Sequence, residues 1–97
     1  MMDMSNMLEM IQQLQKQLRQ MTVKVSAGRG AVELVMNGNQ EVVQIHFKPE
    51  MAGNPAELAR LTAEAFNEAM RESKQMVRDE LSRITGGINI PSVPGLI

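Results

Sequence analysis

Two groups of basic side chains are the residues of this sequence whose type and spacing best suit a chemical task. The first group lies in segment 16–32, which contains no acidic residue, and comprises Lys16, Arg19, Lys24 and Arg29. The second group lies along the helix predicted for residues 54–85 and comprises Arg71, Lys74, Arg78 and Arg83. Cations of this kind neutralise phosphates and release counterions. The two groups therefore favour contact with a polyanion such as DNA.

Glutamines accompany the first basic group and extend the same hypothesis. Amide side chains can reach phosphates or base edges, and the amides concerned are Gln12, Gln13, Gln17 and Gln20. The charge of the whole chain opposes it, because ten basic and eleven acidic residues give a formal net charge of −1. A charged helix edge is in many proteins only a solvated surface. The residues alone leave open whether any one of these side chains contacts DNA.

Residue types that carry catalysis or metal binding are scarce. The chain contains no Cys and one His, which excludes disulfides, thiolate zinc sites and Cys nucleophiles. We expect His46 to be a partly covered strand residue. The segment Gly28-Arg29-Gly30 is too short for a phosphate-binding loop and lacks its Lys. We therefore expect no enzyme, no metal, no cofactor and no small-molecule substrate.

The composition predicts one folded domain over residues 1–97. Hydrophobic residues make up 43% of the chain, and with two Phe and no Trp or Tyr the core must consist of aliphatic side chains and Met. A domain of this size buries only about 60–65% of its unfolded surface, so oligomerisation would be a natural supplement. Neither a signal peptide nor an apolar run of about 20 residues is recognisable. We expect a cytoplasmic protein without a membrane partner.

Residues 3–21 are predicted to form a helix with one apolar seam. Its apolar residues follow one another at steps of three and four, the spacing of a coiled-coil contact. A helix cannot bury such a seam alone, so these residues are expected to pack in the core or in a dimer. They are Met4, Met7, Ile11, Leu14, Leu18 and Met21.

Residues 22–47 are predicted to form a three-stranded antiparallel meander. Alternating, β-branched patterns occupy 22–26, 32–36 and 41–47. We expect the third strand to present Val43, Ile45 and Phe47 on one face. The Asn37-Gly38 pair predicts a tight hairpin in which both turn residues have positive φ.

Residues 54–85 are predicted to form a long second helix, followed by an extended segment at 86–97. Asn54 suits the N-cap and Glu57 can complete a capping box. A broad apolar arc contains Phe66 and Met76, both expected to pack in the core or in a dimer. Glu80 falls inside that arc, so it should find a cation or face solvent. Segment 86–97 is apolar and is expected to dock extended against another surface.

These elements predict an α+β, two-layer protomer in the order α-β-β-β-α. Three short strands can cover only part of two long helices, so both helices should overrun the sheet and project on the same side as arms. Exposed apolar stripes on arms are rarely tolerated by monomers. The economical arrangement is a homodimer with protruding helices.

Three segments resemble the YbaB/EbfC family of bacterial nucleoid-associated DNA-binding proteins. They are GAVELVMNG at 30–38 with its continuation to Ile45, AFNEA at 65–69, and ITGGINIPSVPG at 84–95. The resemblance covers nearly the whole chain. It implies a homodimer, associated with the nucleoid, that binds double-stranded DNA with low or modest sequence specificity and serves chromosome organisation and gene regulation.

A second hypothesis comes from another functional class. The acidic composition and the ten Met residues also suit a homodimeric scaffold or chaperone that offers its apolar arms to a protein partner. The salt dependence of duplex binding separates the two, because phosphate contacts make affinity fall steeply with salt.

Overall fold

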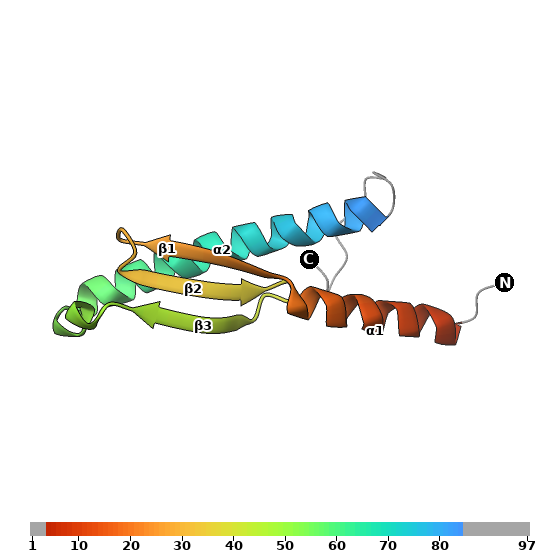
Figure 1. Cartoon of the computed structure of the whole chain (residues 1–97), viewed down its shortest axis with the longest axis horizontal. Coiled ribbons are helices and arrows are strands. Elements are labelled where there is room, and N and C mark those ends of the chain that lie inside the picture. The colour runs from red at the N-terminus through yellow and green to blue at the C-terminus, as the bar shows by residue number, and fades with distance from the viewer. Residues whose placement is uncertain (1–3, 85–97) are drawn as a thin grey trace.

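The structure, a computed structural model, describes residues 4–84 and has the predicted α-β-β-β-α order (Figure 1). The helices are α1 (Met4–Gln20) and α2 (Pro55–Ile84), the strands are β1 (Thr22–Ala27), β2 (Val32–Asn37) and β3 (Val42–Phe47), and a 3-10 helix η1 spans Pro49–Gly53. The predicted α+β class is therefore confirmed. The prediction for segment 86–97 lies outside the described residues. Across 4–84, neither helix is apolar over a length that would span a bilayer.

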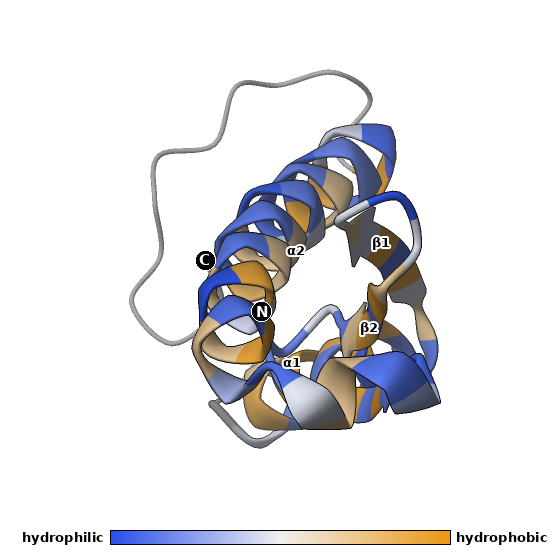
Figure 2. Ribbon diagram, turned by 90° about the vertical axis from the view of Figure 1, so that its left-hand side faces the viewer, coloured by the Kyte–Doolittle hydropathy of each residue, from blue (hydrophilic) through white to orange (hydrophobic). Residues whose placement is uncertain are grey.

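The core lies between the sheet and α2. The strands are antiparallel in the order β1-β2-β3, and α2 packs over β1 and β2 (Figures 1 and 2). Alternate residues of β2 point toward α2 and are fully buried: Val32, Leu34 and Met36. On α2 the small side chains of Ala65 and Ala69 face them, which lets the helix lie close to the sheet. This burial supplies most of the hydrophobic stabilisation of the protomer.

The third strand differs from the prediction by a β-bulge. Val35 pairs with Gln44, but Met36 pairs with Val42, so Val43 is the extra residue. Opposite residues of a sheet share a face, and the α2-facing side of β3 therefore carries Val42 rather than Val43, together with Ile45 and Phe47. The alternation of sequence could not reveal this shift, because a bulge changes the period at one position only.

The turn between β2 and β3 is longer than the predicted two-residue hairpin. The amide of Gln40 donates to the Asn37 carbonyl (3.1 Å) and the amide of Asn37 donates to the Glu41 carbonyl (3.0 Å). Gln40 has positive φ, whereas Asn37 and Gly38 do not. The Asn37 side chain stabilises this wider loop, because its Oδ1 accepts from the amides of Asn39 (2.9 Å) and Glu41 (3.0 Å).

Gly38 is required for a reason other than backbone conformation. Its amide donates to the carbonyl oxygens of Leu18 (2.8 Å) and Met21 (3.0 Å), at the end of α1. A Cβ at position 38 would lie 2.6 Å from the Leu18 carbonyl oxygen. The loop after β2 can therefore touch the end of α1 only through a glycine.

The two helices project beyond the same end of the sheet, as predicted (Figure 1). Where they leave it, Leu18 of α1 packs against Val77 and Leu81 of α2, with Leu14 and Met21 beside them. We call this contact the arm root.

A partly buried polar contact adds to the arm root. Gln17 Nε2 of α1 donates to Glu80 Oε1 of α2 (2.8 Å), and Arg83 forms an ion pair with the same carboxylate. The expectation that Glu80 finds a cation is confirmed. The hydrogen bond from Arg83 is the main cause that lowers the pKa of Glu80, and its charge and Gln17 act in the same direction, against the effect of burial.

The start of α2 follows the prediction only in part. The Glu57 amide donates to Asn54 Oδ1 (3.2 Å), so Asn54 is the N-cap. The capping box is not completed, because the Asn54 amide donates to the Met51 carbonyl of η1 and the Glu57 carboxylate pairs with Arg60.

Gly38→Ala is expected to destabilise the protein by about 1–3 kcal/mol, the range for forcing atoms into a packed site. Gly53→Ala is the matched control, because a Cβ there meets nothing within 4 Å. Denaturant unfolding followed by circular dichroism measures both. Equal stabilities of the two variants would show that the loop does not depend on this close approach.

Glu80→Gln is expected to remove a pH-dependent part of stability. A lowered carboxyl pKa stabilises the folded state above its ordinary value of about 4.3, and the effect is lost as pH falls through the folded-state pKa. The difference in unfolding free energy between wild type and variant should thus be largest near pH 7 and shrink below about pH 4. Other carboxylates are common to both proteins and cancel. A difference that stays constant from pH 7 to pH 3 would contradict this role for Glu80.

Candidate nucleic-acid interface

Half of the basic side chains form ion pairs with carboxylates. Arg19 lies 3.5 Å from Glu41, and Lys24 lies 3.1 Å from Glu33. The paired cations are Arg19, Lys24, Arg60, Arg71 and Arg83. A carboxylate beside a cation repels an approaching phosphate, so these five are the weaker candidates.

The other five basic side chains form no ion pair with any residue of the described chain. They are Lys16, Arg29, Lys48, Lys74 and Arg78. Four of them belong to the set predicted from sequence. Lys48 does not, because it stands alone beside Pro49 and no periodic pattern distinguishes it.

The free cations fall at two ends of the molecule. Ser73 of α2 donates to the Asn37 carbonyl at the end of β2 (2.7 Å), so Lys74 and Arg78 lie on the projecting part of α2. At the opposite end, the Lys48 amide donates to the Ala31 carbonyl (2.9 Å), beside the turn that holds Arg29. The predicted set is therefore not one continuous patch.

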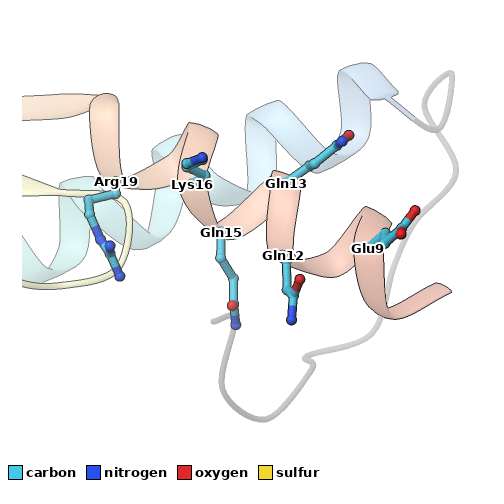
Figure 3. A pocket seen from close by; sticks show the side chains of 6 residues that line it. All are labelled: Glu9, Gln12, Gln13, Gln15, Lys16 and Arg19. Carbon is cyan, nitrogen blue, oxygen red and sulfur yellow. The ribbon is translucent and has the colours of Figure 1, made fainter. Parts of the chain in front are cut away.

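The polar side of α1 forms the second projecting surface (Figure 3). Figure 3 shows Gln12, Gln15 and Arg19 extending to the same side of the helix, and Lys16 next to them. All four side chains are exposed. The Arg19–Glu41 pair is also exposed, with 65% and 58% of the two side chains accessible. Exposed ion pairs of this kind contribute little to the free energy of folding. Lys16 is thus an unpaired cation beside this row of hydrogen-bonding side chains. Arg19 can exchange its exposed pairing with Glu41 for a contact with a phosphate.

Lys74 and Arg78 form a matching pair on α2. They are four residues apart and hence one turn from each other on the helix surface. Lys74 is half-buried and Arg78 is exposed. Together with Lys16 they form a set of three unpaired cations on the two projecting helices, which we call the arm cations.

A separate apolar surface lies on the sheet edge. α2 packs on this face of the sheet but does not extend over β3. Ile45 and Phe47 of β3 and Phe66 of α2 therefore remain 40–44% exposed. Ile45 and Phe66 line a groove of about 590 Å³ with Leu34 and Leu58 at its base. We call this surface the β3 face. It suits an apolar partner and not a phosphate.

The residues predicted for core or dimer packing divide between buried and exposed positions. Leu18 is buried, whereas Leu14, Met21 and Met76 are half-buried. Met7, Ile11 and Phe66 are exposed in the single chain. Met7 and Ile11 lie on the part of α1 that projects beyond the sheet, and Phe66 lies where α2 leaves β3 uncovered. Those three lie outside the core that residues 4–84 form.

Residues 4–84 contain no cluster of three or more His, Asp or Glu side chains placed to hold a metal ion. The chemistry that the described surface offers is therefore charge and hydrogen bonding from the arms, and apolar contact at the β3 face.

Curated relatives match over most of the chain. A nucleoid-associated protein of Thermoanaerobacter pseudethanolicus is 38% identical over 89 residues, which cover 90% of this chain and 80% of that protein. A nucleoid-associated protein of Desulforamulus reducens is 37% identical, with 94% of this chain and 95% of that protein covered.

A solved structure has the same fold. The crystal structure of an uncharacterized protein from Helicobacter pylori superposes with a TM-score of 0.66, covers 84% of this chain and 95% of its own, and is 17% identical.

The sequence profile of the YbaB/EbfC DNA-binding family matches residues 1–88. The chain, with its two projecting helices and unpaired cations, therefore belongs to the YbaB/EbfC DNA-binding family.

Proposed function

We propose that the protein is a homodimer that binds double-stranded DNA with low or modest sequence specificity. It acts in the cytoplasm on the nucleoid, in chromosome organisation and gene regulation. Membership of the DNA-binding family supports this function. The observation that carries it is the set of arm cations, Lys16, Lys74 and Arg78, which have no carboxylate partner within residues 4–84 although acids outnumber bases in the chain.

The arm cations set the strength and character of binding. A dimer presents about six of them, and that number of phosphate contacts corresponds to the non-specific class, with Kd of about 10⁻⁴–10⁻⁶ M. The glutamines of α1 donate and accept without charge. They reach sugar, phosphate or base edges without demanding one sequence. Weak, salt-sensitive and broadly distributed binding follows.

The β3 face supports dimerisation. Ile45, Phe47 and Phe66 form an apolar surface next to an open strand edge, a combination that soluble monomers cover. A second copy brings the same side chains to a two-fold axis, as a symmetric interface requires. The arms then remain outside the interface and free for DNA.

An acidic scaffold that binds a protein is the alternative function. It is favoured by the exposed apolar side chains of the outer part of α1, namely Met7, Leu8, Met10 and Ile11. Duplex binding that is absent at low salt, combined with a stable dimer, would favour this alternative.

Replacing the arm cations together, as Lys16→Gln, Lys74→Gln and Arg78→Gln, is expected to weaken duplex binding at least tenfold. Removing one cation–phosphate interaction also flattens the dependence of log affinity on log salt by about one unit. Fluorescence anisotropy with a labelled duplex at several salt concentrations measures both quantities.

The matched control is Lys24→Gln, Arg60→Gln and Arg71→Gln, which removes the same charge from paired positions. It should change the salt dependence much less than the arm variant. If both variants lose affinity equally, net charge and not the arm surface governs binding.

Ile45→Asp is expected to convert the dimer to a monomer, because it places a charge in the apolar interface. The cost of burying an unpaired charge corresponds to roughly a 100-fold weaker dimer or more. Gln44→Asp adds the same charge to the other face of β3 and should leave the dimer intact. Analytical ultracentrifugation distinguishes the species, and an Ile45→Asp variant that stays dimeric would place the interface elsewhere.

A further inference from the structure

An apolar groove separates the outer part of α1 from the end of α2. Its lining consists of Met10, Ile11 and Leu14 of α1 and Ile84 of α2, with the amides of Gln13 and Gln17 at its edges, and its volume is about 330 Å³. We call it the arm groove. It lies beyond the arm root and apart from both the arm cations and the β3 face.

The arm groove is open because α2 ends before α1 does. Gln17 lies at the level of Glu80, to which it is hydrogen-bonded, and α2 ends one turn later at Ile84. The apolar seam of α1 continues outward from that level through Ile11 and Met7. These two side chains are 42% and 52% exposed, and Ile84 is 53% exposed. Within the described residues, the apolar side of the outer part of α1 thus has no packing partner.

The chain that follows Ile84 has the chemistry to fill it. Segment 85–97 contains no charged side chain, and Ile88 and Ile90 flank a single Asn. In an extended segment, residues i and i+2 point to the same side. The side that carries Ile88 and Ile90 has no charged or polar side chain between them. Its burial therefore costs no desolvation of a charged or polar side chain.

The distances favour a segment of the same chain, and not of a second molecule, as the occupant of the arm groove. From Ile11 to Met7 α1 rises about 6 Å, and an extended chain covers about 3.3 Å per residue. Four residues lead from Ile84 to Ile88 and can span up to about 13 Å, so Ile88 and Ile90 are within reach of the exposed seam. The segment begins at Ile84, a residue of the groove wall, so its effective concentration exceeds that of a partner molecule.

We propose that Ile88 and Ile90 dock in the arm groove of their own chain, where they extend the packing of α2 along the outer turns of α1. The docked segment covers the apolar side of α1 and leaves its polar side, with Lys16, exposed. The outer part of α1, whose own contacts to the sheet end at the arm root, is held by this contact.

Disulfide trapping tests the proposal directly, because the chain has no Cys. Ile11→Cys combined with Ile90→Cys should form an intrachain disulfide under mild oxidation. Gln12→Cys combined with Ile90→Cys is the control, since position 12 is adjacent but on the polar side. The first pair is expected to close about tenfold faster, because disulfides need Cβ atoms within about 4.5 Å. Equal rates, or a disulfide that forms mainly between chains, would overturn the proposal.

Hydrogen exchange of the full-length chain provides an independent measurement without a new covalent bond. Ile88→Asp with Ile90→Asp should lower the protection of amides 7–14 by about tenfold, because the packing that holds this helix end is removed. Asn89→Asp adds charge on the opposite side of the segment and should have little effect. Similar exchange in both variants would show that the segment does not cover α1.

Discussion

The contact between Gly38 and the end of α1 is the constraint on which the rest of the structure depends. The loop after β2 donates from the Gly38 amide to the last carbonyls of α1, and it can approach them because no Cβ intervenes. Carbonyls at a helix end lack partners within the helix, so this bond satisfies them and also sets the position where α1 leaves the sheet. Leu18, fully buried at the same point, adds apolar packing to that bond.

The direction of the two helices follows from this contact. α1 does not fold back over the sheet, and the one face that is covered is occupied by α2. Both helices therefore run past the sheet, joined by Leu18, Val77 and Leu81 and by the Gln17–Glu80–Arg83 contact. A projecting helix exposes more surface than a packed one. The arms carry unpaired cations on their polar sides and an apolar groove between them, and the β3 face lies uncovered on the sheet.

Much of the fold could be predicted from the sequence because its patterns are local. The seam of α1, the alternation of β2 and the cap at Asn54 each depend on neighbours a few residues away. The bulge at Val43 and the conformation of the Asn37–Glu41 loop could not be predicted. The first adds one residue to a short pattern, and the second is determined by Leu18, which lies 20 positions from Gly38 in the sequence.

The candidate site was less accessible from sequence than the fold. Charge type is visible in a sequence, but the pairing of Lys24 with Glu33 or of Arg19 with Glu41 depends on the packing of separate elements. The eight predicted basic residues therefore include four that are paired and four that are free. Lys48 is free as well, and only the structure places it beside the turn that holds Arg29.

The salt dependence of duplex binding by the unmodified protein tests the central claim most directly. If about six unpaired arm cations per dimer contact phosphates, log affinity should fall against log salt with a slope of about −5. An affinity that does not change with salt, or no binding to a duplex at low salt, would contradict the account.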